Sequence, residues 1–184
     1  MKQLLGIAAV VAASLAVVPA ASADERTCRG ALGAVTVDNL RVPEGATCTL
    51  TGTSIKGTLK VEKGATLTAS GIRLVGNVQA ENAKSVTVKA GSRVGGSVQV
   101  KQGGGATVRD STIAGDIQFD ENRSALTARA NRVGGSIQVV KNTGGVTITA
   151  NRVDGNLQCK ENRPAPKGSG NVVNGNKEDQ CARL

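Results

Sequence analysis

The chain has 184 residues and a formal net charge of +9, with 23 Lys and Arg against 14 Asp and Glu. It contains no His, Trp or Tyr, a single Phe and 24 Gly. The lack of His removes the commonest general base and transition-metal ligand, and the near absence of aromatic rings removes the usual stacking platforms for bases and sugars. We therefore expect no metal site, no cofactor and no nucleic-acid partner.

The first 23 residues have the layout of a secretory signal peptide. Lys2 precedes an apolar run over residues 4–18, and the small-residue sequence Ala21-Ser22-Ala23 follows. The alternative is an uncleaved membrane anchor, but the run is shorter than the ~20 residues that a spanning helix needs. We expect cleavage after Ala23, secretion of the remaining 161 residues, and no stable membrane insertion.

Most of the remaining chain is a repeat with a period of 19 or 20 residues, marked by a recurring tetrad such as Gly96-Ser-Val-Gln. The glycines that open these tetrads are Gly57, Gly76, Gly96, Gly115, Gly135 and Gly155, and Asp38 takes the same place one period earlier. Gly175 begins another unit that the C-terminus cuts short. Seven full repeats therefore run from Asp38 to Asn174.

Apolar residues alternate with polar ones within each repeat, which is typical of strands with one buried face. One strand follows each tetrad glycine, as in Val98 and Val100, and a single apolar residue lies two positions before the next one. For the strand between them the sequence predicts inward pairs at Ala46/Cys48, Ala65/Leu67, Val86/Val88, Ala106/Val108, Leu126/Ala128 and Val146/Ile148.

Three short strands and three turns in about 20 residues make one coil of a parallel β-solenoid, in which each strand pairs with its equivalent one coil along. A β-sandwich offers no reason for this period. We predict an all-β, right-handed parallel β-helix of about seven coils, the hand following from that of parallel crossovers. The expected parts are the signal peptide 1–23, an N-terminal cap 24–37, the solenoid 38–174 and a C-terminal cap 175–184.

The repeated Gly-x-Val-Gln-Val units between Asp38 and Gly175 resemble single-stranded right-handed β-helices, bactofilin-like solenoids among them. The segment Asn156-Leu-Gln-Cys-Lys-Glu-Asn-Arg-Pro-Ala-Pro resembles the tail of uncharacterised secreted bacterial β-helix proteins. Bactofilins are cytoplasmic scaffolds that polymerise end to end. This chain departs from them in its signal peptide and its cysteines, so we expect a monomer rather than end-to-end assembly.

The four cysteines lie at the two ends of the predicted solenoid. Cys48 and Cys159 are six coil steps apart, roughly 29 Å, whereas a disulfide needs Cα atoms within about 7 Å. We therefore predict the local pairs Cys28–Cys48 and Cys159–Cys181, which place the protein in an oxidising compartment. The same distance, and the lack of a CxxC pair, argue against a Cys₄ zinc site.

Outward-facing positions that repeat along a solenoid form columns of side chains. We expect the glutamines to hydrogen-bond along one column and the asparagines to stack at a turn. The glutamines are Gln79, Gln99, Gln118, Gln138 and Gln158, and the asparagines are Asn131, Asn151 and Asn171. The match of Asn122-Arg123-Ser124 to a glycosylation acceptor is interpreted as chance.

Threonines suggest a further column, predicted as Thr47, Thr66, Thr87, Thr107, Thr127 and Thr147. Regular Thr arrays on flat β-solenoids resemble the ice-binding surfaces of some antifreeze proteins, where two parallel Thr files are wanted. Here the second file is predicted as Thr49, Thr68, Lys89, Arg109, Arg129 and Thr149. Its three cations interrupt the array, which leaves ice binding as an alternative function only.

Those cations predict a basic ridge. Like charges at paired positions of neighbouring strands are destabilising, so their alignment suggests a functional role. The residues predicted to line it are Lys89, Arg93, Arg109, Arg129, Arg132 and Arg152, with Arg73 further along and no acid between. For a secreted protein with a pI near 9.8, an anionic cell-wall or extracellular polysaccharide is the expected partner. A solvated basic face that keeps the protein soluble is the alternative.

Right-handed β-helices include polysaccharide lyases and hydrolases, so catalysis is the other alternative, by analogy alone. Glycoside hydrolysis needs two carboxylates facing one bond, and a calcium-assisted lyase needs an acidic cluster. Asp116 is the only acid in its column, where its neighbours are serines. Glu62 and Glu81 are the only two acids predicted at equivalent positions of neighbouring coils. We therefore expect a structural or binding protein rather than an enzyme.

Overall fold

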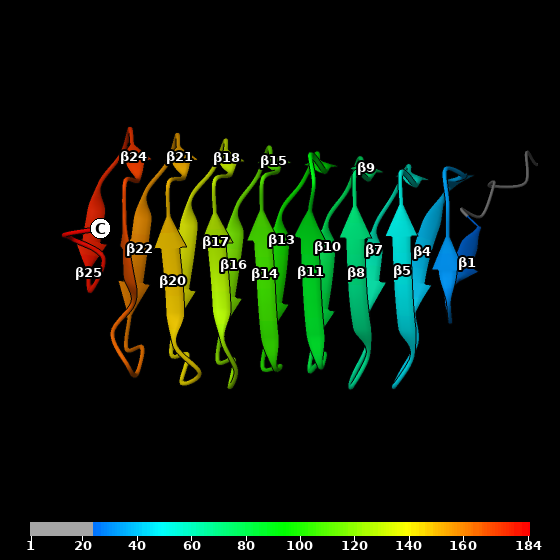
Figure 1. Cartoon of the computed structure of the whole chain (residues 1–184), viewed down its shortest axis with the longest axis horizontal. Helices are drawn as coiled ribbons and strands as arrows, with labels where there is room; N and C mark the ends of the chain where they lie inside the picture. Colours follow the sequence, from blue (N-terminus) through cyan, green and yellow to red (C-terminus); the bar gives the residue numbers. More distant parts are fainter. Residues whose placement is uncertain (1–23) are drawn as a thin grey trace, which may run out of the picture.

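The structure, a computed structural model, describes residues 24–184, so the predicted signal peptide lies outside the described residues. These residues form 25 short strands and no helix. The strands assemble into three parallel sheets that wrap around one elongated core, as Figure 1 shows. This is the all-β parallel solenoid that the repeat predicts.

Each sheet takes one strand from every coil. Sheet A contains β1 (Glu25–Thr27), β4 (Asn39–Val42), β7 (Leu59–Val61), β10 (Val78–Glu81), β13 (Val98–Lys101), β16 (Ile117–Asp120), β19 (Ile137–Val140), β22 (Leu157–Lys160) and β25 (Lys177–Asp179). Sheet B contains β2 (Ala31–Leu32), β5 (Thr47–Thr51), β8 (Thr66–Ser70), β11 (Ser85–Lys89), β14 (Gly105–Arg109), β17 (Leu126–Arg129), β20 (Val146–Thr149) and β23 (Lys167–Ser169). Sheet C contains β3 (Thr36–Val37), β6 (Ser54–Ile55), β9 (Arg73–Leu74), β12 (Arg93–Val94), β15 (Thr112–Ile113), β18 (Arg132–Val133), β21 (Arg152–Val153) and β24 (Val172–Val173).

The coil is right-handed. In Figure 1 the chain rises through sheet B on the near side, crosses the top through sheet C and descends through sheet A on the far side while advancing from right to left. The seven predicted repeats each supply one strand to every sheet. Residues 24–37, predicted as a cap, contribute β1, β2 and β3 at one end of the three sheets, and β25 extends sheet A at the other end.

The core is a narrow column of aliphatic side chains from all three sheets. Leu40, Val98, Ile117 and Leu157 of sheet A are fully buried, as is Phe119, the only aromatic residue of the chain. Burying this apolar surface is the main driving force for folding. A core only one coil wide has room chiefly for Val, Leu, Ile and Ala, which accounts for the composition of the chain.

The tetrad glycines allow neighbouring coils to approach closely at the corner between sheets C and A. There a side-chain oxygen in one coil accepts the N–H of the next, as Asp116 Oδ1 does from Ser136 at 2.7 Å and Ser97 Oγ does from Asp116 at 2.9 Å. A Cβ on Gly135 would collide with Asp116 Oδ1 and with the backbone of Gly115. The glycine is therefore required by this hydrogen-bonded contact between coils.

Buried asparagines bridge the coils at the other two corners. Asn131 Nδ2 donates to Asn151 Oδ1 at 3.0 Å, and Asn151 Nδ2 donates to Asn171 Oδ1 at 3.0 Å, which confirms the predicted stack. An equivalent ladder at the corner between sheets A and B contains Asn122, Asn142 and Asn162. Asn122 is fully buried in this ladder, which makes it unsuitable as a glycosylation acceptor.

The predicted inward pairs of sheet B are buried in the first two repeats, but their register against the later repeats is wrong. Strand pairing aligns Cys48 with Leu67 and Leu50 with Ala69, and places Leu67 opposite Val86. The inward pairs there are therefore Cys48/Leu50 and Leu67/Ala69, two residues further along than predicted. Ala46 and Ala65 are also buried, at the turn before the strand, which is why alternation alone could not distinguish the two registers.

The same shift rearranges the threonines. The aligned column is Thr49, Thr68, Thr87, Thr107, Thr127 and Thr147, one Thr from each of six successive coils. The next column along the strand begins with Thr51 and Ser70 rather than Thr49 and Thr68, and continues through the same cations. The cations still interrupt the second file.

Disulfides close both ends of the rod. Cys28 bonds to Cys48 and Cys159 to Cys181, with Cα atoms 5.7 and 5.2 Å apart, as predicted. All four cysteines are buried against the core. The chain after β25 turns back over the last coil, where Leu184 packs against the core cluster. Two disulfides indicate an oxidising environment.

Candidate functional site: a basic groove

The predicted basic residues fall into two columns on either side of one corner of the solenoid. Lys89, Arg109 and Arg129 end β11, β14 and β17, and they project from the outer face of sheet B. Arg109 and Arg129 are paired in register, and Lys89 follows the pair formed by Val88 and Val108. With neighbouring strands ~4.8 Å apart, the three cations form a continuous file along the rod.

The second column lies on sheet C. Arg93 pairs with Arg73 on one side and with Thr112 on the other, and Arg132 pairs with Thr112 and with Arg152. All four arginines are exposed, because the inward positions of these two-residue strands are occupied by Leu74, Val94, Val133 and Val153. The structure thus places all six predicted residues, and Arg73 further along, on the two sides of this corner.

A shallow groove lies at the corner between these two columns, along the coils of Asp110, Ala130 and Ala150. These three exposed residues line it with Arg132 and Arg152, and so do the buried residues Ser111 and Asn131. Asp110, Ala130 and Ala150 adopt positive φ angles of 51°, 52° and 53°, so the chain turns tightly from sheet B into sheet C. We refer to this surface, with its flanking cations, as the basic groove.

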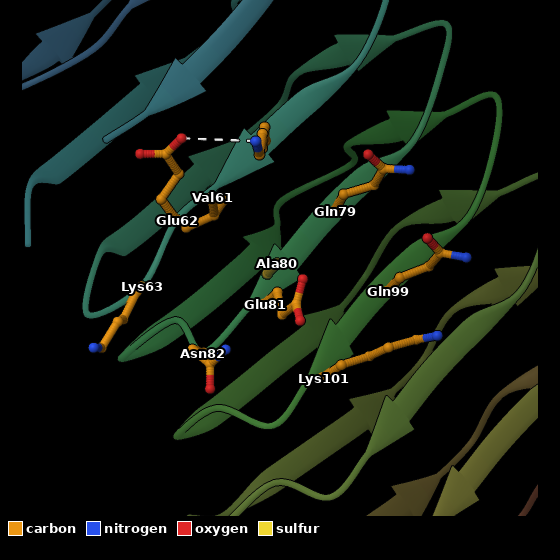
Figure 2. A pocket seen from close by; sticks show the side chains of 10 residues that line it. Val61, Glu62, Lys63, Gln79, Ala80, Glu81, Asn82, Gln99 and Lys101 are labelled. Atoms are coloured by element: carbon orange, nitrogen blue, oxygen red, sulfur yellow. Dashed lines mark ion pairs between the residues drawn. The ribbon is translucent and has the colours of Figure 1, made fainter. Parts of the chain in front are cut away.

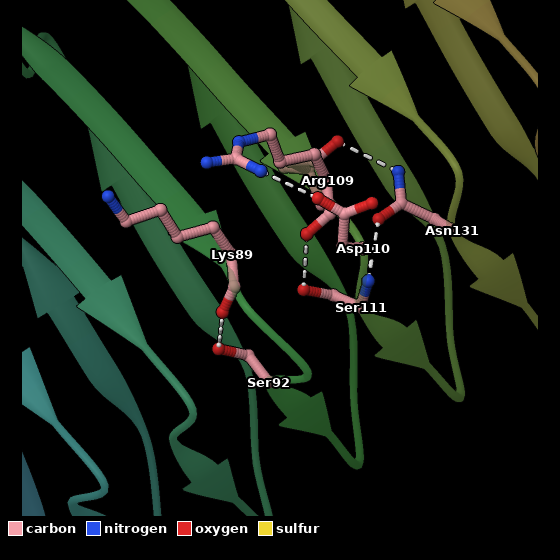
Figure 3. Close-up of polar contacts among 7 residues, drawn as sticks. Lys89, Ser92, Arg109, Asp110, Ser111 and Asn131 are labelled. Atoms are coloured by element: carbon pink, nitrogen blue, oxygen red, sulfur yellow. Dashed lines mark hydrogen bonds and ion pairs between the residues drawn. The ribbon is translucent and has the colours of Figure 1, made fainter.

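Buried hydrogen bonds hold the turns that carry these cations, as Figure 3 shows. Ser111 Oγ donates to Arg109 O at 2.8 Å, and Ser92 Oγ donates to Lys89 O at 2.6 Å. The backbone N–H of Ser111 donates to Asn131 Oδ1 at 3.2 Å. The asparagine ladder therefore lies directly beneath the groove and fixes the spacing of the residues along it.

Asp110 corrects the expectation that no acid lies within the ridge. Its carboxylate Oδ2 is 2.6 Å from Arg109 Nη1, and both side chains are about half exposed (Figure 3). Alignment of the repeats shows that Asp110 stands where later coils have Ala130 and Ala150. The acid could have been found in the sequence as the charged exception in a column of small residues.

Counted coil by coil, the groove is not uniformly positive. The coil of β11 and β12 contributes Lys89 and Arg93, and the coil of β17 and β18 contributes Arg129 and Arg132. The coil between them has Arg109 neutralised by Asp110, and Thr112 in place of an arginine. The outer coils add Arg73 and Arg152. The groove therefore consists of two groups of three cations separated by a neutral coil.

A second hollow lies on the outer face of sheet A, where β7, β10 and β13 meet the turn into sheet B (Figure 2). It contains both predicted acids, Glu62 and Glu81, together with Lys60 and Lys101. Glu62 is already engaged, since its Oε1 lies 3.6 Å from Arg41 Nη1 and 3.7 Å from Lys60 Nζ. This mixture of charges gives no field of one sign.

Other polar columns are used in holding the coils together. Gln99 Nε2 donates to Gln118 Oε1 at 3.1 Å, which is one of the expected contacts within the glutamine column. Asp116, the lone acid beside the serines, accepts a backbone hydrogen bond as described above. Within residues 24–184, no group of three His, Cys, Asp or Glu side chains is arranged to hold a metal ion. No helix in the same range is long and apolar enough to span a membrane.

Fold and groove together define a parallel β-solenoid with an elongated basic surface. Comparison of the chain with protein-family models, curated proteins and solved structures gives no match. The structure confirms the predicted β-helix architecture, whereas the comparisons do not confirm the resemblance to bactofilin-like solenoids or to secreted β-helix proteins.

Proposed function

We propose that this protein is a secreted, non-enzymatic binding module that engages an anionic polysaccharide of the cell wall or extracellular matrix through the basic groove. The observation that carries the proposal is the gathering of cations in two neighbouring columns, in which Arg73 pairs with Arg93 and Arg132 with Arg152. Like charges at directly paired positions destabilise a sheet. Within the described residues only Arg109 of these columns has an acidic partner, so an anionic ligand is the simplest explanation of what offsets the repulsion.

The shape of the groove favours a polymer over a small molecule. The cations from Arg73 to Arg152 span four coil steps, roughly 19 Å along the rod. The groove is shallow and open along the turn that lines it, so it offers no enclosed cavity for a compact ligand. An extended chain lying along the rod would meet a cation in almost every coil.

The carboxylates support a binding role over catalysis. Glu62 is paired with two cations, Asp116 accepts a backbone hydrogen bond, and Asp110 is paired with Arg109. A pair of carboxylates free to face one glycosidic bond is the minimum for most glycoside hydrolases. Secretion rests on the signal-peptide pattern of residues 1–23 and on the two disulfides.

Co-sedimentation with purified cell wall at low and high salt tests this proposal. Binding should be strong at low salt and weaken as salt screens the charges, over a range where the Debye length falls from ~30 to ~8 Å. The triple variant Lys89→Glu/Arg109→Glu/Arg129→Glu should abolish binding. Binding that persists unchanged in this variant, or that does not respond to salt, would overturn the proposal.

A matched variant separates the groove from net charge. Lys101, Lys141 and Lys160 are exposed at the corner between sheets A and B, and their replacement by Glu changes the net charge by the same amount. This control should retain binding to purified cell wall. Equal loss in both triple variants would show that overall charge, and not the groove, attracts the polymer.

A further inference from the structure

The distribution of charge within the basic groove carries information about the ligand. The two groups of cations are Arg73, Lys89 and Arg93 at one end and Arg129, Arg132 and Arg152 at the other. In each group one coil contributes two cations, and these two coils are two coil steps apart, about 10 Å. Between them lies the only coil of the five in which an acid stands at the turn from sheet B into sheet C and a threonine replaces the sheet C arginine.

We propose that the groove selects a polysaccharide whose anionic groups are spaced about two coils apart, with neutral sugar between them, over one that carries a charge on every sugar. This inference rests on the proposed function, because it assigns the ligand class of the same groove. A charge on every second sugar places anionic groups at intervals comparable with the separation of the two groups of cations. A neutral sugar then lies over the central coil.

Asp110 is the residue that makes the selection. Its exposed carboxylate lines the groove and pairs with Arg109, so an anionic group placed over the central coil meets a negative charge and no unpaired cation. Like-charge contact disfavours the wrong ligand, which is a common way of building specificity. Thr112 also disfavours an anionic group over the central coil, because it is uncharged where the neighbouring coils have Arg93 and Arg132.

The backbone does not require an acid at this position. Ala130 and Ala150 adopt the same positive φ in the equivalent turns, and the only side-chain hydrogen bond of Asp110 in the described chain is the one with Arg109. Replacement of Asp110 by Ala therefore copies a residue that the next two coils already accept. Thr112→Arg likewise copies the paired positions. A doubly substituted protein is expected to fold normally.

The test compares two carboxylate polysaccharides by isothermal titration calorimetry, using oligomers of equal sugar number. Hyaluronan oligomers carry a carboxylate on every second sugar, and polygalacturonate oligomers carry one on every sugar. The wild-type protein should bind the hyaluronan oligomer more tightly, by roughly threefold or more, although it has fewer charges. Simple counting of charges predicts the opposite order.

The Asp110→Ala/Thr112→Arg variant should reverse the order, with polygalacturonate affinity raised by about tenfold. The control variant Asp120→Ala/Gln138→Arg makes the same change of charge on sheet A and should keep the wild-type order. An unchanged order in the groove variant would overturn the inference, as would tighter binding of polygalacturonate by the wild type. Salt-sensitive binding of both oligomers with equal affinity would overturn it while leaving the proposed function intact, whereas binding of neither would count against both.

Discussion

Arg109 and Arg129 occupy directly paired positions of β14 and β17, so that two guanidinium groups project from the same face of sheet B one coil apart. Only the Arg109 side chain has an acidic partner, Asp110. Within the described chain, the other ion pairs lie nearer the N-terminal end and join residues of opposite sign, such as Lys56 with Asp38 at 3.0 Å. Arg41 and Lys60 are also paired cations, on sheet A, but Glu62 forms an ion pair with each of them. In the part of the chain that the structure describes, no ion pair involves Arg129.

Arg129→Thr should make the protein more stable while weakening its binding to the polymer. Thr occupies the same column at Thr149 and is favoured in strands, so the free energy of unfolding should rise by about 0.5 kcal/mol. Urea denaturation provides the measurement. Lys101→Thr is the contrasting variant, because Lys101 pairs with Glu81 and Asp120, and it should lower stability slightly. A shift in the same direction for both would refute the like-charge explanation.

Asn142→Ala should destabilise the fold severely. Asn142 is fully buried, its Oδ1 accepts two hydrogen bonds from Asn122, and its Nδ2 donates to Phe119 O at 2.9 Å. Truncation leaves these donors and acceptors unsatisfied, at a cost of about 3 kcal/mol in the free energy of unfolding. Gln102→Ala, at an exposed position of the same corner, should cost less than about 0.5 kcal/mol. Thermal unfolding followed by circular dichroism distinguishes the two.

Gly135→Ala should cost about 2–3 kcal/mol, because the added Cβ meets Asp116 Oδ1 and the backbone of Gly115 and forces neighbouring coils apart. Gly33→Ala is the control, since a Cβ there meets nothing within 4 Å. The comparison uses midpoints of chemical denaturation. Similar small effects at the two positions would show that close approach of the coils is not what requires the tetrad glycine.

Removing the C-terminal disulfide should loosen the end of the rod. The bond closes a segment with a sequence separation of 22 residues, and Cys159→Ser/Cys181→Ser should lower the free energy of unfolding by about 3 kcal/mol. Amide hydrogen exchange should then increase first in β22 and β25, while the central coils keep their protection. Uniform loss of protection along the rod would show instead that the coils unfold as a single unit.

The sequence by itself determined the architecture, the number of repeats, the disulfide pairs and the alignment of the predicted basic residues in columns. A fixed period of 19 or 20 residues stacks each coil on the preceding one. Residues one period apart, such as Arg132 and Arg152, therefore become neighbours. The stack of Asn131, Asn151 and Asn171 was predicted for the same reason, whereas the ladder of Asn122, Asn142 and Asn162 was missed.

Only the tertiary structure decided the register of sheet B in the first repeats and the charge balance of the groove. Alternation of apolar residues is satisfied equally by Ala46/Cys48 and by Cys48/Leu50, and hydrogen bonding between coils selects the second. The role of Asp110 depends on the tight turn that places its exposed carboxylate beside Arg109. Periodicity specifies which residues stack, whereas the length and conformation of each turn decide which charges meet.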